Sequence, residues 1–237
     1  MCDDRNEGSA TTDMGRIVLI TLPILLAALA TSAPARPHPS PATERRAFAD
    51  RILASTNVEW SDYFALRGRA YKSPGRMFMH LPDGHPARGF GYFRKLGINV
   101  ELSDMIDIQR AQPASADLIT ALIIAHEVAH HVQSELEEAD ENHRVANMDR
   151  ELEADCAAGW WLAKANARNL NAIGKPFLLV QDIAVELPRA LHLLSGAKEE
   201  ARTQDVKTHG GVGNRVSAIQ SGMRSPMVED CGAGFRF

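Results

Sequence analysis

The segment IIAHEVAHH, residues 123–131, decides how the rest of this 237-residue chain is interpreted. His126 and His130 are four residues apart, so on a helix they lie on nearly the same face, one turn apart. Two imidazoles placed in this way can bind one zinc ion, and Glu127 between them can deprotonate a water at the metal. The apolar residues before His126 indicate a buried helix, where such a polar trio needs partners that offset its desolvation. The segment therefore predicts a metal site on a core helix.

A second segment, RELEAD at residues 150–155, supplies the protein ligand that the first segment leaves missing. Glu151 and Asp155 share one helix face, and Glu151 can be the third ligand. Asp155, one turn further, can accept the N–H of a ligand histidine and fix its tautomer. Glu153 points elsewhere on the helix, so we interpret it as a solvated side chain. Together the two segments predict a site for one Zn²⁺ ion with three protein ligands, His126, His130 and Glu151.

The overall composition is that of an ordinary globular protein, with 45% hydrophobic and 24% charged residues. These fractions exclude a disordered chain, a collagen, a disulfide-dense miniprotein and a membrane protein with many spans. The formal net charge of −4 gives no electrostatic reason to expect nucleic acid as a partner. The length suits one domain with short appendages.

The amino-terminal region has the features of an export signal. Its apolar run, residues 17–30, is shorter than the roughly 20 apolar residues of a membrane span and has the length of a signal-peptide core. Met14 is a better start than Met1, because it is followed by a basic rather than an acidic stretch. We expect residues 1–33 to be a signal peptide, with a single uncleaved N-terminal membrane anchor as the main alternative and a buried core helix as the other. The signal peptide and the anchor both predict an extracytoplasmic protein, either periplasmic, secreted or anchored.

After a Pro-rich linker at residues 34–42, residues 43–237 are expected to form one domain. The Gly- and Pro-rich residues 71–103 predict a small antiparallel sheet. Two cysteines of the exported chain, Cys156 and Cys231, could form a disulfide or remain buried thiols, and the sequence leaves both open. Helices are expected from Thr43 to about Leu53, around Trp60 to Leu66, from Ser115 through Val132, over 147–169, from near Pro176, and over 214–222.

Several segments resemble the bacterial family of "putative neutral zinc metallopeptidases", within the gluzincin group. In family order, the similar segments are VEWSDYFALRGRAYKSP at 58–74, HEVAHHVQ at 126–133, ELEADCAAGWW at 151–161 and THGGVGNR at 208–215, followed by Cys231. The resemblance implies a helix-rich, zincin-like α+β core with the zinc between the two motif helices. It also implies ligands His126, His130 and Glu151, a catalytic base Glu127, and a supporting carboxylate Asp155.

Two departures from the family pattern concern the surroundings of the site. The sheet segment GYFRKLGINVELS, residues 91–103, lacks the family's cysteine pair, and the helix segment VSAIQSGM, residues 216–223, lacks its aromatic residues. We therefore expect the substrate cleft and the carboxyl-terminal lid to differ while the zinc chemistry is kept.

The predicted activity is that of a zinc metallopeptidase, an endopeptidase on protein or peptide substrates, with Glu127 as general base. The developing oxyanion needs a further donor, for which His209 is the candidate and Arg215 the second choice. Residues 100–102 could offer a strand edge to an extended substrate. An alternative function is a catalytically inactive zinc-binding envelope protein that acts through partner binding. A metal-free adaptor is a third.

Other prominent residues take structural interpretations. His131 points about 100° away from His130 and is not expected to be a ligand. Trp160 and Trp161 are expected to pack in the core. The acidic run at 135–141 is interpreted as a solvated helix end rather than a calcium site.

Overall fold

The computed structural model describes residues 40–74, 77–78, 90–94, 97–139, 147–168, 188 and 211–237. Residues Pro39–Phe237 form one compact unit. The predicted signal segment, the start at Met14, the helix near Pro176, the candidate His209 and the acidic residues after Ala139 lie outside the described residues. Within the described ranges, no helix is both long and apolar enough to cross a membrane.

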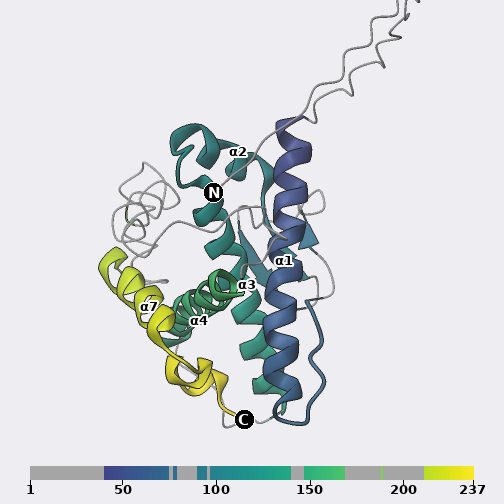
Figure 1. The fold of residues 1–237 in the computed structure, drawn as a ribbon, viewed down its shortest axis with the longest axis vertical. Helices are drawn as coiled ribbons and strands as arrows, with labels where there is room; N and C mark the ends of the chain where they lie inside the picture. The colour runs from purple at the N-terminus through teal and green to yellow at the C-terminus, as the bar shows by residue number, and fades with distance from the viewer. Residues whose placement is uncertain are drawn as a thin grey trace, which may run out of the picture. The chain divides into compact units, whose positions relative to one another are not determined.

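The architecture is helix-rich α+β, as predicted (Figure 1). The α-helices are α1 (Pro41–Ala65), α2 (Leu102–Ala111), α3 (Ala116–Ala139), α4 (Asn147–Ala167) and α7 (Val212–Arg224), and two short 3₁₀ turns, η3 (Val228–Cys231) and η4 (Ala233–Phe235), follow. The strands are β1 (Met77–Phe78), β2 (Gly91–Phe93) and β3 (Gly97–Asn99).

Helix α1 is one continuous helix where the sequence predicted two. Ser40 is its N-cap, with the hydroxyl accepting the Thr43 N–H at 3.2 Å, and Pro41 takes the first turn, where its missing N–H costs nothing. The helix therefore begins inside the predicted linker, residues 34–42. Its buried residues continue from Phe48 to Phe64, so one face packs against the core from Phe48 to the carboxyl end of the helix.

The sheet is mixed, with strand order β1-β3-β2. Strands β2 and β3 pair antiparallel, as predicted, whereas β1 pairs parallel with β3. Strand β3 ends at Asn99 and Val100 is fully buried, so the strand edge predicted at residues 100–102 is wrong. Helix α2 begins at Leu102, and its apolar residues Met105 and Ile108 face the core.

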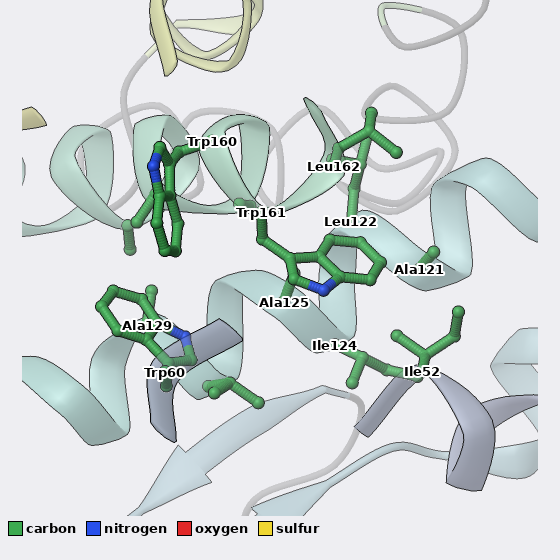
Figure 2. Packing of buried hydrophobic residues seen from close by; sticks show 14 of the residues in the cluster. Ile52, Trp60, Ala121, Leu122, Ile124, Ala125, Ala129, Trp160, Trp161 and Leu162 are labelled. Atoms are coloured by element: carbon green, nitrogen blue, oxygen red, sulfur yellow. The ribbon is translucent and has the colours of Figure 1, made fainter. Parts of the chain in front are cut away.

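Helix α3 is the centre of the core, packing against α1, α4 and the sheet. Figure 2 shows Trp161 of α4 lying over Ala125 of α3, and Trp60 of α1 near Ala129. Trp60 also contacts Trp160, with ring centroids 5.3 Å apart. Both Trp160 and Trp161 are buried, which confirms the core interpretation.

Helices α4 and α7 cross at two glycines that allow their backbones to touch. A Cβ on Gly222 would lie 1.8 Å from the carbonyl oxygen of Cys156, and one on Gly159 would lie 2.0 Å from that of Ile219. Only residues without a side chain fit at this distance. The crossing brings Arg215, in the first turn of α7, to Asp155 of α4.

The carboxyl-terminal turns are attached to α4 and α1. Cys156 and Cys231 form a disulfide with a Cα–Cα distance of 5.5 Å. The hydroxyl of Tyr63 on α1 donates to the carbonyl of Phe235. The Gly234 N–H donates to the Glu153 carboxylate at 3.1 Å, so the interpretation of Glu153 as a solvated side chain is wrong.

Candidate metal centre

The two histidines of α3 and the glutamate of α4 meet at one point. The Nε2 atoms of His126 and His130 lie 3.2 and 3.3 Å from the same oxygen of Glu151. The three candidate ligand atoms lie within 4.8 Å of one another, a cluster that could hold a metal ion. Four-residue spacing places both imidazoles on one face of α3, and the packing of α4 on α3 brings Glu151 to that face.

The tautomer of His126 follows from its contact with Asp155. Nδ1 of His126 lies 2.9 Å from Oδ1 of Asp155, which is buried and ionised and can only accept. Nδ1 therefore carries a proton, and Nε2 is left to face Glu151. This is the arrangement in which an imidazole presents its nitrogen to a metal.

Arg215 of α7 holds Asp155 in turn. Its Nε and Nη2 donate to the two carboxylate oxygens at 2.8 and 3.0 Å, a bidentate pair. Burial raises the pKa of Asp155, but Arg215 and His126 outweigh it and hold the pKa below its usual range. The structure thus places Arg215, the second choice for the oxyanion donor, on Asp155.

The donor set fits a cation. With Nδ1 protonated on a histidine, Nε2 and the Glu151 oxygen would face each other with lone pairs, so a positive charge is needed between them. Burial lowers the pKa of His126, but Asp155, Glu151 and Glu127 raise it to about 10. Burial likewise raises the pKa of Glu151, while His126 and His130 hold it well below its usual range. Two histidines with one carboxylate are a set that catalytic zinc uses.

Glu127 belongs to the same site. It follows His126 on α3, its side chain is buried, and its negative charge acts on the His126 imidazole. A carboxylate so placed can exchange protons with a molecule bound at the ligand cluster.

His131 faces away from the cluster. Its Nε2 lies 2.6 Å from the carbonyl oxygen of Lys72, which can only accept, so Nε2 donates. The Tyr92 hydroxyl is 3.4 Å from Nδ1, and the ring packs edge-on against Tyr71 and Tyr92. His131 is buried and connects α3 to the sheet region.

Gln133 is a residue of the site that the sequence interpretation missed. Its Oε1 lies 2.9 Å from Nδ1 of His130. The spacing of three residues on one helix was a signal that could have found it, since such residues are neighbours on the helix surface.

The chain matches, over residues 25–234, a family described as "Putative neutral zinc metallopeptidase". Among curated proteins it is similar to "Uncharacterized protein YpfJ" of Escherichia coli strain K12, with 30% identity over 136 residues, which cover 50% of this chain and 47% of that protein. The protein of the same name from Escherichia coli O6:H1, strain CFT073, gives the same values. The chain thus spans about half the length of these curated relatives. No solved structure matches it.

Proposed function

We propose that this chain, which belongs to the neutral zinc metallopeptidase family, is an active zinc-dependent endopeptidase that hydrolyses peptide bonds in protein or peptide substrates. The observation that carries the proposal is the convergence of His126, His130 and Glu151 from two helices. The orientation of each imidazole by its own hydrogen-bond acceptor supports it further.

In this proposal, His126, His130 and Glu151 hold one zinc ion. Zinc bound there would supply a Lewis acid that polarises the scissile carbonyl and acidifies a water. Asp155 keeps the His126 ring in place, and Arg215 neutralises the charge of Asp155.

Glu127 acts as general base and then as general acid. Its carboxylate accepts a proton from the attacking water as the new C–O bond forms at the peptide carbon. It then gives that proton to the amide nitrogen as the C–N bond breaks, so the products are a carboxylic acid and an amine, which exchange the remaining proton to give a carboxylate and an ammonium group. Such transfer contributes typically 10²- to 10⁴-fold to a rate. His209 stays a candidate for the oxyanion donor.

Export is part of the proposal. The bond between Cys156 and Cys231 supports it, because disulfides persist in oxidising compartments such as the periplasm. Sequencing the amino terminus of the protein isolated from the envelope tells whether residues 1–33 are removed or are kept as a membrane anchor.

The test compares the wild-type chain with Glu127→Gln and with a matched control, Glu135→Gln. The control makes the same chemical change two turns further along α3, beside His131. We measure bound zinc by elemental analysis and cleavage of casein. All three proteins are expected to bind one zinc per chain, with cleavage at least about 100-fold slower in Glu127→Gln alone.

The other outcomes discriminate between the functions. Zinc binding without any cleavage by the wild type would support the inactive zinc-binding protein instead. Equal cleavage by all three proteins would reject Glu127 as the base. A wild-type chain without zinc would reject both zinc functions.

A further inference from the structure

Gln133 connects the second histidine of the cluster to the carboxyl-terminal turns. We propose that Gln133 is a positioning residue, which fixes the tautomer and ring orientation of His130 and is itself held by Glu153 and the η4 turn. The inference rests on the zinc site of the proposed function.

The first step is the orientation of the Gln133 amide. Its side chain is fully buried on α3. Nε2 donates to the carbonyl oxygen of Arg150 at 3.1 Å and to Oε2 of Glu153 at 3.4 Å. Because a backbone carbonyl can only accept, the NH₂ group must face Arg150. The amide oxygen is therefore the atom that faces His130.

The second step is the tautomer of His130. An amide oxygen is an acceptor, so Nδ1 of His130, 2.9 Å away, must donate to it. Nε2 is then left to face Glu151 at 3.3 Å. Gln133 does for His130 what Asp155 does for His126, but with a neutral group.

The third step explains why the acceptor is neutral. The charge of Asp155 is balanced by the bidentate Arg215. The NH₂ side of Gln133 faces a carbonyl and a carboxylate, so a carboxylate at this position would meet two acceptors instead of a cation. A neutral amide satisfies both sides at once, since it accepts at one end and donates at the other.

The fourth step leads to the carboxyl-terminal turn. Oε2 of Glu153 accepts the Gly234 N–H at 3.1 Å. A Cβ on Gly234 would lie 2.5 Å from Oε2 of Glu153 and 3.2 Å from Nε2 of Gln133, so the turn lies directly against both side chains. The η4 turn therefore covers the Gln133 amide and holds its partner.

The experiment uses two substitutions with opposite expectations. Gln133→Met is of similar length and replaces the amide oxygen with a thioether sulfur, which accepts only weakly, whereas Gln133→Glu keeps an oxygen toward His130 and loses the amide donor. The control is Thr120→Val, which removes a fully buried polar group from the same helix, six residues before His126. The zinc dissociation constant is measured by competition with a chromophoric chelator, and the d–d absorption spectrum is recorded with Co²⁺.

If Gln133 positions His130, Gln133→Met weakens zinc binding about 10- to 100-fold and alters the cobalt spectrum. Gln133→Glu, whose second oxygen meets the Arg150 carbonyl and Glu153, loses stability but binds zinc more tightly than Gln133→Met, because it keeps an acceptor toward His130. Thr120→Val leaves both readouts unchanged. If Gln133→Met does not fold, Gln133→Asn replaces it, because this amide is one methylene too short to reach His130 and should show the same loss.

The contrary results are distinct. Wild-type affinity in Gln133→Met or Gln133→Asn would overturn the inference while leaving the proposed function intact. Equal losses in Gln133→Met and Gln133→Glu would show that the amide acts only as a structural donor, which also overturns it. Absence of zinc binding by the wild type would overturn the proposed function, and the inference with it.

Discussion

The contact between α4 and α7 predicts that Gly222→Ala destabilises the protein, although alanine is the better helix former. A Cβ at Gly222 would lie 1.8 Å from the carbonyl oxygen of Cys156, and real Cβ atoms essentially never approach closer than 3.0 Å. The two helices must therefore separate by the difference, about 1.2 Å. The oxygen belongs to the backbone of α4, so no side-chain rotation can relieve the contact.

The magnitude combines two opposing terms. Replacing glycine in a helix interior with alanine stabilises by up to about 1 kcal/mol. Overpacking costs typically about 1–3 kcal/mol, and weakening a buried ion pair adds to it, because α7 carries Arg215 to Asp155. We expect a net loss of about 2 kcal/mol in the free energy of unfolding.

Urea denaturation of the wild type, Gly222→Ala and Gly213→Ala measures this difference. Gly213 is on the same helix, but a Cβ added there would have no described atom of a neighbouring element within 4 Å. Gly213→Ala should therefore be neutral or stabilise by up to about 1 kcal/mol. If Gly222→Ala is as stable as Gly213→Ala, the close crossing of α4 and α7 is refuted.

Three further predictions concern the disulfide, a buried acid and the support of His126. The disulfide joins Cys156 to Cys231 across 75 residues, so reducing it should lower the free energy of unfolding by on the order of 4 kcal/mol. Denaturation with and without reductant measures this difference, and a loss below about 1 kcal/mol would contradict the prediction. Burial raises the pKa of Glu59 from 4.5. The wild type should therefore gain stability relative to Glu59→Gln as the pH falls through the raised pKa toward 4.5, and it should lose that gain as the pH rises again. Parallel pH profiles of the two melting temperatures would argue against this. Asp155→Asn removes the charge beside the His126 imidazole and should weaken zinc binding about 10- to 100-fold in chelator competition, whereas unchanged affinity would show that the carboxylate is dispensable.

The meeting of the three candidate ligands could be predicted from the sequence because it depends on local periodicity. His126 and His130 share a face of α3 by their spacing alone, and Glu151 and Asp155 share a face of α4 by the same spacing. Only the packing of one helix on the other had to be assumed, and apolar residues on both helices favoured it.

The contacts of Glu153 and Arg215 beside this cluster could not be predicted, because they depend on segments distant in sequence. Glu153 lies two residues from Glu151 and so on another side of α4, which a helical pattern assigns to solvent. The carboxyl-terminal turn covers that side, so the side chain has a Gly234 N–H instead of water. Arg215 was predicted only as a second choice for the oxyanion donor and not as the partner of Asp155, since nothing local indicates that α7 crosses α4 at Gly159.

The sequence also did not predict where the last strand ends and helix α2 begins. The apolar residues Ile98 and Val100 alternate as in a strand, and the sequence interpretation extended the strand to Ser103. In the structure, Glu101 is the N-cap residue of α2, and Met105 and Ile108 at helical spacing enter the core. The period changes from two to nearly four within a few residues, and short segments of this kind are ambiguous.

Two residues of α4 have partners much later in the chain: Asp155 pairs with Arg215, and Cys156 is bonded to Cys231. This order has a consequence for biosynthesis. A ribosome makes both motif helices well before it reaches the residues that neutralise Asp155 and close the disulfide. A growing chain therefore carries all three candidate ligands without the segment that supports them. The support of the candidate ligands is complete only after the chain has been synthesised as far as Cys231 and the disulfide has formed.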